Sequence, residues 1–546
     1  MKKFLSDNKR YLKDIIIISI IFLLTNWFML VLTGTWWDEK TWAFSSTAEK
    51  WDISLQLGRP IDFFLQVFIF KIPEVVARII IFICYYCITI GTYFIYNQIA
   101  FFDESHAFLA TIIFVAIPAN DAKVMRGVFP YTVGCFLFIV AFCELILLQK
   151  KYKYNNIPLR ILTIALFLGS FLLNSNLVFY GVPCLYIFRY IIVNGQIRTF
   201  YKWFDFAIAP LVFFGVKICF FPAYGLYEGY NEVTVDRIIF GMIRTINTCV
   251  GRLIDILANW FEFVNIALLF IGIVLLIVVF IYESGAEKFK MILIQKPNVI
   301  SMKYRIILLL IGLIAMYLGA FAYVVTGKYC SLNGVDGRSS ILLPFGAALI
   351  IYAVVLWVPS KCIEIILCIA IVLCGFLHFN SYYLSYQQDY YRQQDLVYEL
   401  NENRDVLFDT KNIIYLSSFE PKVGATRFYT LNSNGREAFG DESHLIMNGI
   451  GDYDYFLRIS EEAWNLFVNQ GDYQMDDYKI GKSSDIEAII VYERNLSRKD
   501  TLMLKIMEIF NCKTFKDKLY GENNLTVYTP EMNEFRDILL QQGYSF

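Results

Sequence analysis

The first long apolar run of the chain, residues 14–32 (DIIIISIIFLLTNWFMLVL), ends just before an aromatic and acidic stretch, residues 35–42 (TWWDEKTW). About 20 apolar residues are enough for a helix to cross a bilayer. Basic residues precede the run and predict a cytoplasmic N-terminus, namely Lys2, Lys3, Lys9, Arg10 and Lys13. The stretch 35–42 is therefore expected at the outer face of the membrane.

Two features of this stretch need different explanations. Tryptophan collects at both interfaces of a bilayer whatever the protein does, so an aromatic belt accounts for Trp36, Trp37 and Trp42 as well as a substrate does. A belt does not account for the adjacent carboxylates of Asp38 and Glu39. These two acids are the first candidates for chemistry.

The composition defines the broad class. Of the 546 residues, 57% are apolar and 17% aromatic, and the mean hydropathy is +0.50, which indicates a polytopic membrane protein rather than a soluble one. The net charge of −1 gives no reason to expect a nucleic-acid partner. The three histidines lie far apart in the sequence, so no metal site is predicted from them.

Apolar runs and basic connections alternate along the first 380 residues. Connections rich in lysine and arginine are expected inside the cell, which puts the N-terminus inside and the C-terminal part outside. Eleven spans are predicted, at residues 14–32, 75–98, 107–118, 131–148, 161–173, 177–192, 204–221, 264–282, 306–325, 341–358 and 362–379. The run 61–72 is too short to cross and is expected as an interfacial helix with Asp62 and Gln66 on one face.

The outer connection 222–260 contains an amphipathic pattern. Apolar residues recur at steps of three and four at Ile239, Ile243, Ile246, Val250, Leu253 and Leu257, and the other side carries Arg237, Arg244, Thr248 and Arg252. An interfacial helix whose arginines reach lipid headgroups fits this pattern. A helix that contacts a lipid-linked phosphate fits it as well.

The composition changes near residue 381, so two domains are predicted: a transmembrane domain at 1–380 and an extracytoplasmic α/β domain at 381–546. The second domain begins with a tyrosine-rich helix over 382–404. Strands are expected at 413–417, 455–459, 486–492 and 525–528, and helices at 461–469, 498–510 and 531–541. The predicted fold is thus mainly α, a helical bundle of about eleven spans that carries an outer α/β domain.

Acidic and basic residues gather in the outer loops. The first loop holds Asp38, Glu39 and Arg59, the second holds Asp121 and Arg126, and a late glycine-rich loop holds Arg338. A carboxylate can act as general base for a hydroxyl nucleophile, and an arginine can hold a phosphate with two hydrogen bonds. Trp36 and Trp37 could stack on a sugar face. Together they suit sugar transfer from a lipid-phosphate carrier.

The order of these motifs resembles a known family. An outer loop with Trp36-Trp37-Asp38-Glu39, a Gly58-Arg59-Pro60 element, an acidic second loop and Asp336-Gly337-Arg338-Ser339-Ser340 before a late span are similar to the GT-C glycosyltransferases, specifically the bacterial phage-type glucosyltransferases that decorate O-antigen or other surface glycans. The resemblance covers residues 15–380. The C-terminal domain matches no family that we can name from its sequence.

The resemblance implies an inverting transfer of a sugar, expected to be glucose, from undecaprenyl phosphate to a surface glycan at the bacterial inner membrane. Asp38 is the first candidate for the base and Glu39 the second, and Asp121 would position the acceptor or a divalent cation. The donor phosphate would be bound by Arg59, Arg126 and Arg338. No other cofactor is expected.

Three alternatives stay open. A surface-glycan polymerase or ligase would use similar arginines. A transporter or flippase for lipid-linked glycans would place ionisable residues deep inside the spans, whereas here most of them fall in the outer loops. A non-catalytic membrane anchor for the C-terminal domain would need one span only.

Overall fold

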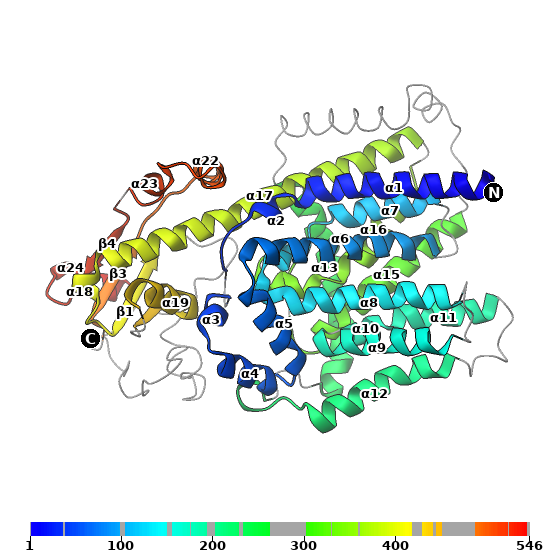
Figure 1. The fold of residues 1–546 in the computed structure, drawn as a ribbon, viewed down its shortest axis with the longest axis horizontal. Coiled ribbons are helices and arrows are strands. Elements are labelled where there is room, and N and C mark those ends of the chain that lie inside the picture. The colour runs from blue at the N-terminus through cyan, green and yellow to red at the C-terminus, as the bar shows by residue number, and fades with distance from the viewer. Residues whose placement is uncertain are drawn as a thin grey trace. The chain divides into compact units, whose positions relative to one another are not determined.

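The computed structural model describes residues 2–36, 39–98, 104–149, 156–174, 176–193, 203–228, 233–262, 302–328, 330–358, 361–417, 428–440, 444–449, 486–521 and 523–542. These residues are mostly helical and contain one small sheet (Figure 1). The chain divides into two compact units that do not follow chain order. The helical unit comprises Met1–Leu30, Leu57–Val124 and Val128–Tyr382, and the α/β unit comprises Val31–Gln56, Met125–Gly127 and Tyr383–Phe546.

The helices of the helical unit follow the predicted apolar runs closely. They are α1 (Lys2–Asn26), α2 (Phe28–Val31), α5 (Pro60–Lys71), α6 (Glu74–Gln98), α7 (Glu104–Ala116), η1 (Asp121–Val124), η2 (Arg126–Val128), α8 (Phe129–Leu147), α9 (Ile157–Leu173), α10 (Asn176–Phe179), α11 (Gly181–Val193), α12 (Phe204–Phe220), η6 (Gly225–Tyr227), α13 (Val235–Glu262), α15 (Met302–Val324), η7 (Val335–Ser340) and α16 (Leu343–Val355), and the first half of α17 (Lys361–Glu402) completes them. Helices α2 and η2 extend one or two residues across the division between the units.

Among the described residues, four helices are long and apolar enough to cross a membrane: Glu74–Gln98, Arg126–Leu147, Met302–Val324 and Ile363–Glu402. Shorter apolar helices accompany them at His106–Ala116, Ile157–Leu173, Asn176–Ile192 and Leu343–Val355. These helices indicate a membrane-associated chain. The predicted span 264–282 lies outside the described residues.

Close packing joins α15 and α16. A Cβ atom on Gly312 would lie 2.8 Å from Ile350 Cγ1, and one on Gly346 would lie 2.3 Å from the Met316 backbone nitrogen. Side chains larger than glycine would force the two backbones apart at both positions. The same core includes α6, α7 and α8, whose buried residues form one continuous apolar cluster with these two helices.

The two helices that the sequence placed at the interface are both present. In α5, Asp62 and Gln66 are buried whereas Phe64 and Phe68 are exposed, as the pattern predicted for one polar and one apolar face. In α13, Thr245, Cys249 and Ile256 are buried, and an apolar row on another side is exposed, including Ile239, Ile243, Ile246, Val250 and Leu257. An exposed apolar row is what a lipid-facing helix requires.

The α/β unit is built on a four-stranded sheet with the order β2-β1-β3-β4. Strands β1 (Asn412–Ser417), β2 (Leu445–Asn448) and β3 (Ala488–Tyr492) are parallel, and β4 (Leu525–Tyr528) is antiparallel to β3. The helices of this unit are α3 (Glu39–Phe44), α4 (Thr47–Gln56), the second half of α17, α18 (Arg404–Leu407), α19 (Phe428–Phe439), α22 (Arg498–Ile509), α23 (Phe515–Leu519) and α24 (Asn533–Gln541).

Both faces of the sheet are covered, which parallel strands require. Consecutive residues Ile413 and Ile414 of β1, and Ile489 and Ile490 of β3, are fully buried although they point to opposite faces. Side chains of α17 and α19 complete one of these cores. Sequence patterns found β1, β3, β4, α22 and α24 but missed β2 and α19, and the predicted strand 455–459 and helix 461–469 lie outside the described residues.

Candidate functional site

The Gly58-Arg59-Pro60 element forms a tight entry into α5. Gly58 has a positive φ of 61°, and a Cβ atom there would lie 2.3 Å from the Phe221 carbonyl oxygen, so both conformation and space favour glycine. Its own carbonyl accepts a hydrogen bond from Lys217 Nζ on α12. Pro60 then begins the helix, where its missing N–H costs nothing. This geometry fixes where the Arg59 side chain starts.

Protein groups hold the Arg59 guanidinium on three sides. Nε pairs with Asp62 Oδ2 at 2.9 Å, Nη1 donates to the Tyr131 hydroxyl at 3.3 Å, and Nη2 donates to the Leu173 carbonyl. The guanidinium also lies over the Tyr131 ring, 4.9 Å from its centre. Burial alone would lower the pKa of Arg59, but Asp62 and Tyr131 hold it above its ordinary value, so the positive charge is permanent.

Other cations join Arg59 around Tyr131. Arg59, Arg338 and Lys328 all contribute to the electrostatic field at the Tyr131 hydroxyl. Burial lowers the pKa of Lys328, Tyr131 opposes this effect, and Arg59 and Arg338 lower the pKa further. Lys217 is close enough to interact with Arg59 and Asp62. We call Arg59, Lys217, Lys328 and Arg338 the cation cluster.

Asp62 is the carboxylate that interacts with two of these cations. It is 7% exposed, and its Oδ1 has no hydrogen-bond partner among the described residues. Burial raises the pKa of the Asp62 carboxyl to about 6, although Arg59 and Lys217 act in the opposite direction. The carboxylate therefore changes its charge close to neutral pH, and the net charge of Asp62 and the cation cluster together changes with it.

The loop that was predicted as the second outer loop and the late glycine-rich loop meet in the helical unit. The Asn120 backbone N–H donates to Ser340 Oγ at 3.1 Å, and Ser340 Oγ donates to the Gly337 carbonyl at 2.7 Å. A Cβ atom on Gly337 would lie 3.4 Å from the Asp121 backbone nitrogen. This contact puts η1 beside η7, which carries Arg338.

Asp121 lies within the protein and not on a surface. Asp121 Oδ2 and His378 Nε2 are 3.3 Å apart, and both side chains are fully buried. Asp121 Oδ1 has no hydrogen-bond partner among the described residues. His378, on α17, had no signal in the sequence because its partner is 257 positions away.

Lys123 borders a small cavity next to this pair. The cavity has a volume of about 50 Å³ and is lined by Asn120, Lys123, Tyr85 and Phe379 among others. The ammonium lies 3.7 Å from the centre of the Phe379 ring, a cation–π contact. Burial lowers the pKa of Lys123 to about 7, and Asp121 opposes the shift. The cavity has room for water but not for a sugar ring.

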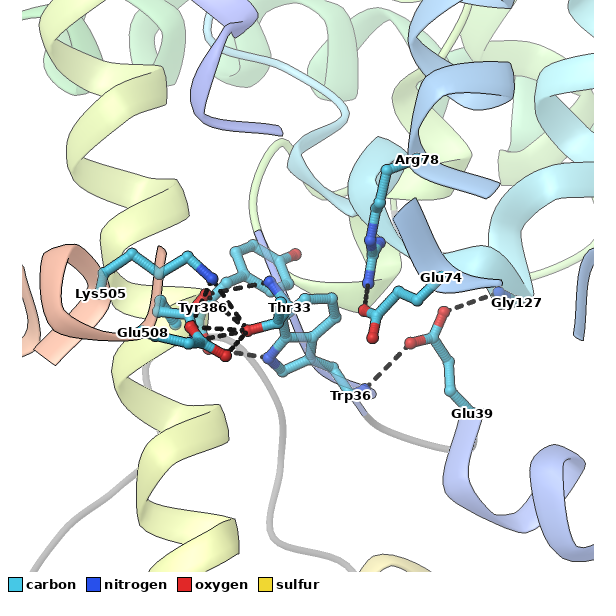
Figure 2. Close-up of polar contacts among 10 residues, drawn as sticks. Thr33, Trp36, Glu39, Glu74, Arg78, Gly127, Tyr386, Lys505 and Glu508 are labelled. Atoms are coloured by element: carbon cyan, nitrogen blue, oxygen red, sulfur yellow. Dashed lines mark hydrogen bonds and ion pairs between the residues drawn. The ribbon is translucent and has the colours of Figure 1, made fainter. Parts of the chain in front are cut away.

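Trp36 and Glu39 belong to the α/β unit. Figure 2 shows their polar contacts. Trp36 is 1% exposed, so its ring is not available to stack on a sugar in this conformation. Glu39 is fully buried, and its two oxygens accept from the Trp36 backbone N–H at 3.0 Å and the Gly127 backbone N–H at 2.7 Å. A carboxylate bonded in this way fixes the segment at the start of α3.

The structure gives less information about the remaining predicted site residues, Arg126, Trp37 and Asp38. Arg126 is buried and lies next to Gly127, so it belongs to the α/β unit, while Arg59 and Arg338 belong to the helical unit. Trp37 and Asp38 lie outside the described residues. The described part of the chain contains no group of three His, Cys, Asp or Glu side chains that could hold a metal ion.

Sequence reasoning missed the two lysines of the cation cluster. Lys328 was part of the outer loop that contains Arg338, so its position next to a predicted phosphate ligand was the available signal. Lys217 lies near the end of the apolar run 204–221 and offered only its charge. Comparisons of the chain with protein-family models, curated proteins and solved structures found no match.

Proposed function

We propose that the protein is a membrane glycosyltransferase that moves a sugar, with glucose as the first candidate, from a polyprenyl-phosphate carrier to a cell-surface glycan. The observation that supports this proposal is the cation cluster. Four basic side chains, from the residue before α5, from α12, from the loop after α15 and from η7, interact around Tyr131 and Asp62. Close cations repel one another, and a bound phosphate would relieve that repulsion.

The charge of the cation cluster matches the chemistry of the reaction. The acceptor hydroxyl attacks the anomeric carbon of the donor, the bond from that carbon to the phosphate oxygen breaks, and a base takes the hydroxyl proton. The donor phosphodiester carries one negative charge, and the departing polyprenyl phosphate gains a second. Cations near the phosphate therefore stabilise the transition state more than the bound donor, which is the condition for catalysis.

The remaining roles follow the motifs of the outer loops. Asp38 is our first candidate for the base, because both oxygens of the second candidate, Glu39, accept backbone hydrogen bonds. Asp121 would position the acceptor or a divalent cation through the loop that it anchors. Arg126 stays a candidate for the donor phosphate with Arg59 and Arg338.

The proposed topology has eleven spans, a cytoplasmic N-terminus, and residues 381–546 outside the cytoplasmic membrane of a bacterium. Polyprenyl-phosphate donors suit this arrangement because soluble nucleotide sugars are made on the other side of the membrane. The bundle of apolar helices supports a polytopic protein, and the eleven-span count rests on the sequence pattern.

Transfer and donor binding should be measured on the purified protein in lipid nanodiscs. The donor is a synthetic polyprenyl-phosphate glucose and the acceptor a surface-glycan fragment, and the variants are Arg338→Gln and Lys328→Gln. We expect each to weaken donor binding about tenfold, because each removes a charge next to the phosphate. Lys303→Gln is the matched control, since Lys303 is an exposed lysine at the other end of α15 from Lys328.

The outcomes separate the candidate functions. Donor binding that is equal in the wild type, the two cluster variants and the control would contradict the phosphate role of the cation cluster. A wild type that transfers no sugar, but carries a fluorescent lipid-linked glycan across the bilayer, would replace the enzyme with a transporter. Transfer of a whole glycan chain instead of one sugar would identify a polymerase or ligase.

A further inference from the structure

The first outer segment, Val31–Gln56, is part of the α/β unit, and three contacts fix it there. The first contact is at Thr33 (Figure 2). Its backbone N–H donates to Gln387 Oε1 at 3.1 Å, and its hydroxyl bonds to Glu508 at 3.1 Å and to Lys505 at 3.0 Å. Gln387 lies on α17 and the two charged residues lie on α22, so the segment is joined to two helices at once.

The second contact is at Trp36 (Figure 2). The indole Nε1 donates to the Tyr386 carbonyl oxygen on α17 at 2.8 Å. The two rings pack edge to face, with their centres 5.1 Å apart and their planes at 87°. Both side chains are almost completely buried. A buried tryptophan with its N–H bonded is a strong anchor, because its large apolar surface and its one donor are both satisfied.

The third contact is at Lys40 on α3, the residue after Glu39. Its ammonium donates to Asn434 Oδ1 at 2.6 Å and pairs with Glu437 Oε2 at 2.8 Å, both on α19. Lys40 is 4% exposed. Burial lowers the pKa of Lys40, and Glu437 opposes this shift. A buried charge is costly without a partner, so α3 is stable in this position only when α19 supplies the acceptor groups.

These contacts give the C-terminal domain a role. We propose that α19, through Asn434 and Glu437, positions the segment that carries the candidate bases for sugar transfer, and that Lys40 is the residue through which it acts. The inference rests on the proposed function. Lys40, Asn434 and Glu437 are positioning residues, because they bond to one another and act on the reaction through the adjacent Glu39 and Asp38.

The expected kinetic signature follows from this role. A base that is misplaced slows proton removal but leaves the donor-phosphate residues unchanged. Loss of the Lys40 contact should therefore lower kcat about 10- to 100-fold and change KM for the donor less than about twofold. A general loss of folding would instead reduce the amount of active protein, and neither kcat per folded molecule nor KM would change.

The test is a charge exchange on the full-length protein in nanodiscs. Lys40→Glu and Glu437→Lys each put like charges together, and the double variant restores an opposite pair. Lys40→Arg is the conservative variant. Lys513→Glu is the matched control, because Lys513 is an exposed lysine of the same unit. Transfer kinetics and hydrogen exchange over residues 39–56 are both measured, and the exchange needs no substrate.

We expect both single variants to show faster hydrogen exchange over residues 39–56 and a lower kcat. The double variant and Lys40→Arg should have exchange rates and kcat close to those of the wild type. The Lys513→Glu control should match the wild type in both measurements. Unchanged exchange in both single variants would overturn the anchor. Faster exchange with unchanged kcat would show that the Lys40 contact holds the segment but does not position a base for sugar transfer. A wild type that transfers no sugar would refute the proposed function and the catalytic half of this inference, while the exchange data would still decide whether Lys40 anchors the segment.

Discussion

Arg59 and Lys328 carry the same charge in the cation cluster, but they differ in what their removal should do. The guanidinium of Arg59 joins α5 to Tyr131 on α8 and to the Leu173 carbonyl at the end of α9. Lys328 is a point charge on the loop after α15. Arginine presents a rigid fork of donors that a lysine cannot reproduce. Arg59 is thus a structural link as well as a charge.

Arg59→Lys keeps the charge and removes the fork, so it tests the structural link. We expect the variant to lose about 1–3 kcal/mol of stability, the usual cost of leaving buried polar partners unsatisfied. Thermal unfolding in detergent measures the loss. Lys328→Arg is the comparison and should stay close to the wild type, and equal stability of the two variants would refute the link.

Asp62 should make donor binding depend on pH. Because burial raises the pKa of its carboxyl to about 6, lowering the pH through that value neutralises a negative charge beside the cation cluster. Binding of a phosphodiester donor should tighten as the pH falls, since the charge of the phosphodiester itself stays constant. Asp62→Asn should bind more tightly at neutral pH and lose the dependence. Titration calorimetry measures both, and a variant that keeps the wild-type pH profile would contradict the assignment.

Lys123 should limit stability near neutral pH. The pKa of its ammonium is lowered to about 7 in the folded state, so between that pH and the ordinary lysine value the unfolded chain binds more protons than the folded chain. Stability should therefore rise with pH in this window, by up to about 1.4 kcal/mol per unit. Lys123→Met removes the charge, so it should be more stable than the wild type near pH 7 and lose that advantage toward pH 10. If the stabilities of the wild type and Lys123→Met changed with pH in the same way, the lowered pKa of Lys123 would be contradicted.

At the scale of elements, α13 shows how one helix can serve three environments. Thr245, Cys249 and Ile256 face the protein, an apolar row that includes Ile243 and Val250 is exposed, and polar residues such as Arg244 occupy the remaining side. Sequence periodicity predicted two sides because it separates apolar from polar residues. It could not show that residues as small as Thr245 and Cys249 form part of a buried side.

The apolar row of α13 should face lipid. Single cysteines at Ile243 and Val250 should be shielded from a membrane-impermeant maleimide in nanodiscs, whereas a cysteine at Arg244 on the polar side should react. Mass spectrometry of the peptides separates these sites from the native cysteines. Equal reaction at all three positions would contradict a lipid-facing row, and reaction in detergent-free denaturant provides the control for intrinsic reactivity.

Secondary structure was predictable where it depends on neighbouring residues. Apolar run length gave most helix positions, and the Ser497 capping box with Asp500 marks the observed start of α22. The pattern failed for β2, which is only four residues long and is defined by pairing with β1. It also divided α17, which is one helix of 42 residues, because composition changes within it from apolar to tyrosine-rich.

At the scale of the whole molecule, the two units draw on distant parts of the chain. Residues 31–56 fold with residues 383–546, although more than half of the sequence lies between them. The predicted division after residue 380 follows the change of composition, and the break at Tyr382 lies close to it. Composition cannot show that an early loop belongs to the late domain, because that membership depends on contacts such as Lys40 with Glu437.

A chain that ends at Tyr382 should therefore leave the first outer segment without its partners. Trypsin should cut after Lys40 in this truncated chain but spare it in the full-length protein, where Lys40 is buried and paired. Limited proteolysis in nanodiscs measures the difference. Cleavage after the exposed Lys303 should be alike in both proteins, and an equally protected Lys40 would show that the segment does not need the C-terminal domain.

The sequence by itself determined the membrane-associated class and most helix positions, because hydrophobic run length is a local property of the chain. Only the tertiary structure decided which distant side chains meet: Arg59 with Tyr131, Asp121 with His378, and Lys40 with Glu437 across 397 positions. Side chains so far apart in the chain meet because separate elements pack together, and a one-dimensional pattern carries no record of that packing.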